Sequence, residues 1–257
     1  MIKIKTKEDI AILREGGKHH AQLMKTLVDM VKPGVSTEAF DATLRKLIKE
    51  IGDEPSILGY QPYGAKRPYP ASICVSINDE VVHGIPNDNP RVLKEGDVVS
   101  LDFALTHRGM ITDMAVTVPV GKISDELHDL LTTTREALMT GIKIARGGKR
   151  VGDVSSAIEH IGFAGGYGVV EDLAGHGVGY AVHEDPFIPN YGDPGKGEVL
   201  KPGTVIAIEP MFNLGTHEVV LDKYDGYTYR TKDGKQSAHF EHTVLITKGE
   251  AEILTSI

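Results

Sequence analysis

The sequence has no tryptophan and a single cysteine, Cys74, among its 257 residues. One cysteine cannot form an internal disulfide, so we expect a protein of a reducing compartment, the cytoplasm. No apolar run approaches the roughly 20 residues of a membrane-spanning helix. The polar N-terminal segment also lacks the apolar core of a secretory signal. We therefore expect a soluble cytoplasmic protein that does not bind membranes.

Positive charge is also scarce. Lys and Arg number 28 against 36 Asp and Glu, which gives a formal net charge of -8, and there is no basic run. Nucleic-acid-binding domains usually carry a basic patch, so nucleic acid is not an expected partner. The phosphate-binding patterns G-x-x-x-x-G-K-[ST] and G-x-G-x-x-G are absent, as is the G-x-S-x-G turn of many serine hydrolases.

Signals for helices occur twice, each time followed by apolar strand-like runs. Capping residues and helical spacing predict helices over about residues 7–31, 37–51, 125–146 and 153–161. Segments 92–102 and 199–209 share Val, Leu, Lys, Gly and Val at a constant offset of 107. Chance matching of strand starts is the alternative to a repeat. We predict one catalytic domain, 1–257, built from two similar halves of about 1–121 and 122–257.

Two apolar runs, 98–105 and 110–118, flank the polar break 106–109 and predict a hairpin. If the turn is centred between His107 and Arg108, Asp102 lies directly opposite Asp113. Like charges in such a pair, about 5 Å apart, are destabilising. Either both carboxylates are hydrated on an exposed face, or a divalent cation neutralises them.

Further polar residues interrupt apolar or glycine-rich runs. His176 and His183 are seven residues apart and would face opposite ways on one continuous strand, so either the chain turns between them or only one is a ligand. Glu209 and Glu241 lie in apolar runs, where an unpaired carboxylate is costly. Four carboxylates with one or two histidines favour two adjacent metal ions over a single zinc. Cys74 has no adjacent base and is interpreted as a packed thiol.

Seven ordered segments resemble the type I methionine aminopeptidases of peptidase family M24 across nearly the whole chain; they are residues 78–86, 100–103, 112–113, 175–179, 183–186, 208–211 and 240–243. The resemblance implies an α/β pita-bread fold, in which two pseudo-symmetric halves form an antiparallel sheet flanked by helices. It also implies removal of the N-terminal methionine from nascent proteins and peptides by metal-assisted hydrolysis. An Xaa-Pro aminopeptidase or prolidase-like enzyme, or a non-catalytic binding protein on the same fold, is the alternative.

The resemblance also implies roles for individual residues. The implied metal ligands, for two divalent ions of Mn²⁺, Fe²⁺, Co²⁺ or Zn²⁺, are Asp102, Asp113, His176, Glu209 and Glu241. The implied catalytic residues are His83, His183 and Glu209. The implied substrate-binding residues are His83, His183, Tyr60, Tyr69, Cys74 and Tyr227. The ribosome is a candidate partner, and we expect a monomer.

The chain departs from the family pattern at the substrate pocket. Segment 60–70 is longer than its counterpart, which lines the methionine pocket. Tyr227 stands where many relatives place a tryptophan, and Val182 replaces a commonly aromatic residue. We therefore expect a methionine pocket of altered shape.

Overall fold

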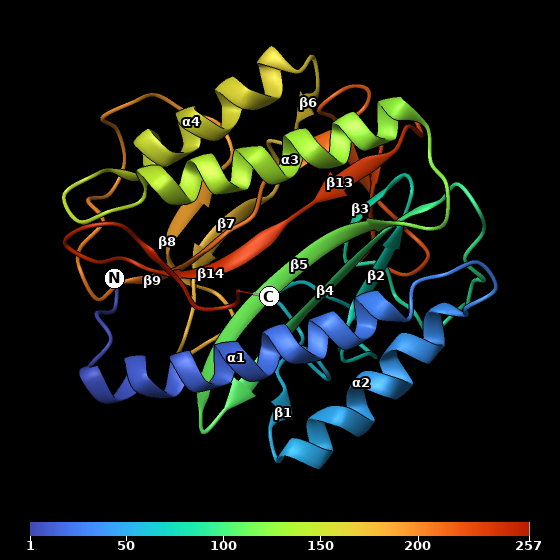
Figure 1. The fold of residues 1–257 in the computed structure, drawn as a ribbon, viewed down its shortest axis with the longest axis horizontal. Helices are drawn as coiled ribbons and strands as arrows, with labels where there is room; N and C mark the ends of the chain where they lie inside the picture. Colours follow the sequence, from blue (N-terminus) through green and yellow to red (C-terminus); the bar gives the residue numbers. More distant parts are fainter. Residues whose placement is uncertain (257) are drawn as a thin grey trace.

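The computed structural model describes residues 1–256, which form a mixed α/β structure around one large antiparallel sheet. Its main path runs through β1 (Glu54–Pro55), β4 (Val98–His107), β5 (Met110–Pro119), β14 (Glu241–Leu245), β9 (Val205–Ile208), β7 (Ala174–Gly177) and β8 (Glu184–Pro189). Off this path, β2 (Cys74–Ile77) pairs with β4 and β15 (Glu252–Ile253) pairs with β14. The pairing of β5 with β14 joins the N-terminal and C-terminal parts of the sheet (Figure 1).

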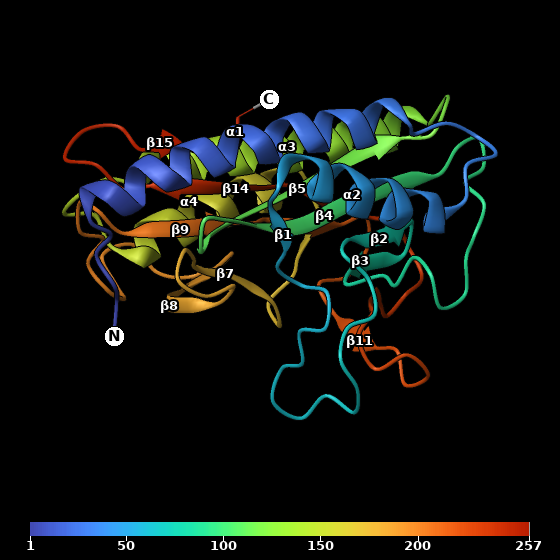
Figure 2. The same ribbon diagram turned by 90° about the horizontal axis from the view of Figure 1, so that it is seen from below.

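Two small antiparallel sheets accompany the large one. One consists of β13 (Ser237–His239), β10 (Met211–Asn213) and β6 (Gly168–Val169); the other consists of β11 (Val219–Leu221), β12 (Tyr229–Thr231) and β3 (Glu80–Val82). The helices lie along one face of the large sheet, whereas β3 and β11 of the second small sheet lie on the other side (Figure 2). Apolar clusters fill the space between the helices and the sheet in both halves.

The helices are α1 (Lys7–Asp29), α2 (Thr37–Ile51), α3 (Asp125–Ile144) and α4 (Val151–Ala164), close to the predicted ranges. Thr6 and Asp9 form a reciprocal capping box that begins α1. Ser124 Oγ accepts a hydrogen bond from the Leu127 amide at the start of α3. Gly52 ends α2 with a positive φ of 78°, which glycine adopts without strain. No helix within residues 1–256 is long and apolar enough to cross a membrane.

The predicted register of the central hairpin was wrong by two residues, because the turn is centred one residue later than predicted. Asp102 lies opposite Ala115, and Asp113 lies opposite Ala104. The turn is centred between Arg108 and Gly109, whose φ angles of 48° and 81° are both positive, as a two-residue hairpin loop of this hand requires. The two aspartates still share one face, but as diagonal rather than opposed neighbours.

The same pair of backbone hydrogen bonds occurs at equivalent points of the two halves. The Leu93 amide donates to the Val35 carbonyl, and the Leu200 amide donates to the Lys149 carbonyl. The Gly34 amide donates to the Leu93 carbonyl, and the amide of its counterpart Gly148 donates to the Leu200 carbonyl. The offset-107 segments thus dock in the same way against the starts of α2 and α4, which supports the predicted repeat.

Candidate active site

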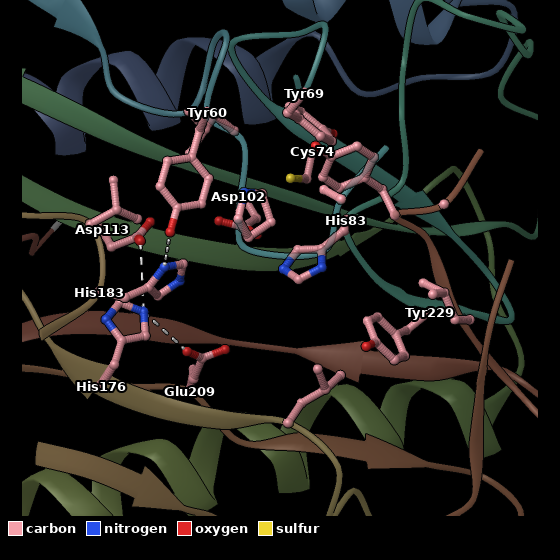
Figure 3. Close-up of a pocket in the computed structure, with 18 of the residues that line it drawn as sticks. Tyr60, Tyr69, Cys74, His83, Asp102, Asp113, His176, His183, Glu209 and Tyr229 are labelled. Atoms are coloured by element: carbon pink, nitrogen blue, oxygen red, sulfur yellow. Dashed lines mark hydrogen bonds and ion pairs between the residues drawn. The ribbon is translucent and has the colours of Figure 1, made fainter. Parts of the chain in front are cut away.

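A cavity of about 510 Å³ is lined by residues of β4, β5, β7 and β14 and by the segments that follow β3 and β9. Its lining contains all eleven residues singled out from the sequence: Tyr60, Tyr69, Cys74, His83, Asp102, Asp113, His176, His183, Glu209, Tyr227 and Glu241. Figure 3 shows Asp113, His176, His183 and Glu209 close together, with Tyr60 reaching toward His183, whereas Tyr69 and Cys74 lie together in another part of the cavity. The cavity therefore has a charged part and an apolar part.

The carboxylates come from strands at the centre of the large sheet. Asp102 and Asp113 project from β4 and β5, Glu209 directly follows β9, and Glu241 begins β14. Thr243 Oγ1 accepts a hydrogen bond from the Asp113 amide at 2.7 Å and so fixes β5 against β14. The sheet thereby brings together residues that are up to 139 positions apart in the sequence.

His176 contributes the imidazole that meets these carboxylates. Its Nδ1 lies 3.0 Å from the Gly177 carbonyl, which can only accept, so Nδ1 carries the proton and Nε2 is free. Nε2 lies 3.5 Å from Glu209 Oε1 and 4.0 Å from Asp113 Oδ2 (Figure 3). One ligand atom each from Asp113, His176 and Glu241 lies within 4.8 Å of the others. An imidazole held by a carbonyl with its second nitrogen facing acids is the usual arrangement of a metal ligand.

The carboxylates repel one another in this cavity. Burial raises the pKa of Asp102 to about 6. Burial also raises the pKa of Asp113 and Glu241 well above their ordinary values, and the neighbouring carboxylates add to the effect. For Glu209 burial acts in the same direction, but the hydrogen bond from His239 and the nearby histidines outweigh it and lower the pKa. Within residues 1–256, Glu241 Oε1 has no hydrogen-bond partner. This donor set fits divalent cations, which would supply the missing positive charge.

The chain turns between His176 and His183, which resolves the two alternatives left by their spacing. His176 belongs to β7 and His183 directly precedes β8, so the rings meet edge to face with centroids 4.5 Å apart. The Tyr60 hydroxyl lies 3.1 Å from His183 Nδ1. Burial lowers the pKa of His183 to about 4, and the neighbouring His176 adds to this effect.

His83 reaches the cavity from the loop after β3. Its φ of 61° is positive, a strained conformation for a residue other than glycine. The chain must turn sharply there because the Gly84 carbonyl accepts a hydrogen bond from the Val75 amide, and a side chain on Gly84 would collide with the Val75 carbonyl. Burial lowers the pKa of His83. The turn therefore places the His83 side chain in the lining of the cavity.

The apolar end of the cavity is formed by Tyr69, Cys74 and Tyr227, packed with Ile57, Ala65, Ala71 and Ile85. The Tyr69 and Tyr227 rings meet edge to face at 5.2 Å. Burial raises the pKa of the Cys74 thiol well above its ordinary value, which agrees with the packed thiol expected from the sequence. The longer segment contributes Pro62 to Ala65 to the same wall and projects from the molecule in Figure 2.

Sequence reasoning missed two residues of the site. His239 is buried, and its Nε2 lies 3.4 Å from Glu209 Oε2. Its spacing of two residues from Glu241 could have indicated a shared face. Tyr229 lines the cavity and packs against His83 with ring centroids 6.1 Å apart. It lies in a short strand, β12, that has no alternating apolar pattern to reveal it.

The sequence profile of metallopeptidase family M24 matches residues 11–248. The chain is 45% identical in sequence to a methionine aminopeptidase from Aquifex aeolicus. The match covers 100% of this chain and 99% of that protein. The chain belongs to the methionine aminopeptidases of metallopeptidase family M24. The crystal structure of the methionine aminopeptidase from Thermotoga maritima superposes on this structure with a TM-score of 0.94. The superposition covers 100% of both chains, and the two sequences are 41% identical. The predicted family and its pita-bread fold are thereby confirmed.

The alternative relatives of this M24 chain share only its fold. The structure of a prolidase from Pyrococcus furiosus superposes with a TM-score of 0.75 and 24% sequence identity. The superposition covers 99% of this chain but only 65% of the prolidase chain. Membership of a metallopeptidase family agrees with the fit of the buried donor set to divalent metal ions.

Proposed function

We propose that this chain is a methionine aminopeptidase that hydrolyses the first peptide bond of polypeptides beginning with methionine. The observation that carries the proposal is one cavity in which a buried histidine and carboxylate cluster adjoins an apolar, tyrosine-lined wall. Relatives more than 40% identical over the full chain carry the same activity in their names. A free N-terminal methionine has both parts that such a cavity would bind: an apolar side chain and a polar amide.

We assign the metal ligands to Asp102, Asp113, His176, Glu209 and Glu241, and we propose that they hold two divalent ions. Two ions suit five ligands of which four are carboxylates, and this oxygen-rich set favours Mn²⁺ or Fe²⁺, with Co²⁺ and Zn²⁺ as further candidates. When bound, the ions lower the pKa of a water molecule and polarise the scissile carbonyl.

Glu209 is placed to move protons during hydrolysis. Oε1 and Oε2 lie within about 3.5 Å of His176 and His239 respectively, so the carboxylate is held at the centre of the cluster. As water oxygen adds to the carbonyl carbon, Glu209 accepts a proton from that water. It returns the proton to the leaving nitrogen as the C–N bond breaks. The products are free methionine and a peptide shortened by one residue.

His183 and His83 stabilise the charge that develops on the carbonyl oxygen. As neutral rings they each donate one N–H. Donation from the Tyr60 hydroxyl to His183 Nδ1 leaves the proton of His183 on Nε2, from which it can be donated to substrate. A pre-oriented donor of this kind stabilises the transition state more than the ground state. His83, with its constrained backbone, binds the substrate backbone or the same oxygen.

Tyr60, Tyr69, Cys74 and Tyr227 bind the methionine side chain. Thioether sulfur packs favourably against aromatic rings, and these rings are already held by contacts to protein backbone. Tyr69 OH donates to the Gly84 carbonyl at 3.0 Å, and Tyr227 OH donates to the Arg67 carbonyl. The preformed wall selects an unbranched apolar side chain.

The substrates in the cell are nascent polypeptides, with the ribosome as a candidate partner and the cytoplasm as the location. The single, buried cysteine supports a reducing compartment. We propose that the chain acts as a monomer because all five assigned ligands come from one chain.

The activity is tested with metal-depleted recombinant protein reloaded with Mn²⁺, Fe²⁺ or Co²⁺. Met-Ala-Ser should release free methionine only after metal is restored, and an Ala-Pro peptide should remain intact. Cleavage of the Ala-Pro peptide in preference to Met-Ala-Ser would establish the prolidase-like alternative. Full activity of the metal-depleted protein would exclude a metal mechanism.

A further inference from the structure

A second group of metal-binding side chains lies outside the catalytic cavity. His19 belongs to α1, Asp53 follows α2 and His107 ends β4. One candidate ligand atom from each lies within 4.8 Å of the other two. Side chains alternate along a strand, so His107 leaves β4 on the face opposite Asp102. The group therefore lies beneath α1, on the helix-covered face, and the sheet separates it from the cavity (Figures 1 and 2).

Asp53 holds the two imidazoles together. Its Oδ2 lies 2.8 Å from His19 Nδ1, and its Oδ1 lies 2.6 Å from His107 Nδ1. The carboxylate is only 2% exposed, and the two rings meet edge to face with centroids 4.8 Å apart. Two histidines from different elements thus converge on one buried acid.

The second nitrogen of His107 faces another carboxylate. Its Nε2 is buried and has no hydrogen-bond partner within residues 1–256, and Glu15 Oε2 lies 3.4 Å away. The His107 side chain is 9% exposed. Glu15 thus adds a second negative charge beside the His107 ring, which favours a cation bound by this group.

The sequence makes room for this arrangement. A side chain on Gly16 would lie 2.8 Å from His107 Cβ, so glycine allows α1 to approach the end of β4 closely. Glu15 precedes Gly16, and His19 lies one turn further along the same helix. The tight turn at Arg108 and Gly109 ends the strand directly after His107. Three segments distant in the chain are therefore built around one small volume.

We propose that His19, Asp53 and His107 form a site for one transition-metal ion, such as Zn²⁺, separate from the catalytic centre. Two imidazoles and one carboxylate, with water in the remaining position, are a donor set that four-coordinate zinc accepts. Glu15 is 53% exposed and His19 is 28% exposed, so an ion can enter from solvent. The ion joins α1 to the hairpin and to the segment after α2, and it stabilises the fold by binding only the folded chain.

The test measures zinc binding by the full chain after complete metal removal. Equilibrium dialysis against Zn²⁺ with metal analysis compares the wild type with His19→Gln and Asp53→Asn. His128→Gln, which changes an exposed histidine on α3, is the matched control. We expect the wild type and the control to bind one equivalent more than either site variant, and Zn²⁺ to raise their melting temperatures further. Activity of the variants on Met-Ala-Ser should stay within about twofold of the wild type.

Equal zinc stoichiometry in the wild type, both site variants and the control would overturn the proposal, because the group would then hold no ion. The difference in equivalents does not depend on how many ions the catalytic centre takes. The proposal therefore stands or fails independently of the peptidase activity. His19→Gln alters a partly exposed side chain, so it keeps the test valid if Asp53→Asn fails to fold.

Discussion

Glu241 is a carboxylate that gains little from the protein alone. Its Oε1 is buried without a hydrogen-bond partner among residues 1–256, and Asp113 is a close neighbour. Glu241→Gln keeps the shape and removes one negative charge. We expect turnover of Met-Ala-Ser to fall by roughly 100-fold or more, because a metal ligand is lost, while the metal-free protein melts no lower than the wild type.

Kinetics on Met-Ala-Ser, metal analysis and thermal unfolding of the metal-free protein check this prediction together. Glu136→Gln changes an exposed glutamate on α3 and serves as the control. Wild-type turnover by Glu241→Gln with full metal content would remove Glu241 from the ligand set.

Tyr60 and Tyr224 are a matched pair for testing the orientation of His183. The Tyr60 hydroxyl lies 3.1 Å from His183 Nδ1, whereas Tyr224 is fully exposed and does not line the cavity. Tyr60→Phe should lower kcat roughly tenfold with little change in KM, because the donor that faces the substrate loses its orientation. Tyr224→Phe should change neither constant. Equal kinetics for the two variants would show that the hydroxyl does not orient His183.

At the scale of elements, cap residues predicted the helices well because a cap is a local interaction. Thr6 and Gly52 satisfy backbone groups within a few residues of themselves, so the sequence near them carries the whole signal. The hairpin register was missed because it depends on which two residues adopt positive φ. Arg108 adopts a positive φ beside Gly109, and arginine is not a residue type from which a positive φ is predicted.

The candidate site was predicted more completely than the turns that assemble it. Buried acids such as Glu209 and Glu241 are visible in sequence because they interrupt apolar runs. That His176 and His183 meet depends on a turn in a glycine-rich segment, which permits many conformations. His239 contacts Glu209 only through pairing of distant strands, and no local pattern encodes that contact.

The loop before β8 depends on a buried ion pair between Lys5 and Glu184. Lys5 Nζ lies 2.7 Å from Glu184 Oε2, with side chains 1% and 4% exposed. Glu184 Oε1 accepts hydrogen bonds from the Tyr180 and Ala181 amides. Lys5→Met leaves a buried carboxylate unpaired, which typically costs roughly 3–5 kcal/mol. Because His183 adjoins Glu184, kcat should fall as well.

Urea unfolding and Met-Ala-Ser kinetics measure both effects of Lys5→Met. The double variant Lys5→Met with Glu184→Gln removes the unpaired charge and should recover part of the stability. Lys3→Met is the control, because Lys3 forms no ion pair within residues 1–256. An unchanged midpoint for Lys5→Met would show that the pair adds nothing to the fold.

For the whole molecule, the cavity lies where the two halves of the sheet meet. Asp102 and Asp113 come from one half, and His176, Glu209 and Glu241 come from the other. The strands β5 and β14 join the halves directly beside Asp113 and Glu241. Neither half alone contains the ligand set, so we expect the predicted halves of about 1–121 and 122–257 to function only as a single domain.

The stability of the whole molecule should depend on pH through His20, which is fully buried against Phe103 with ring centroids 4.1 Å apart. Burial lowers its pKa from 6.5 to about 3, and the neighbouring His242 adds to this effect. Between these values the unfolded chain binds a proton that the folded chain does not. Stability is therefore lost as the pH falls below about 6.5, by up to about 1.4 kcal/mol for each pH unit.

His20→Gln removes this titration and keeps a polar partner for Thr112, whose hydroxyl lies 3.0 Å from His20 Nδ1. Urea unfolding of the metal-free protein at pH 7 and pH 5 measures the effect. The wild type should lose about 2 kcal/mol more than the variant between these pH values, because one more proton separates its folded and unfolded states. His128→Gln, at an exposed position, should lose as much as the wild type. If His20→Gln keeps the full wild-type acid sensitivity, His20 binds its proton in the folded state, and the acid response arises from the other buried histidines.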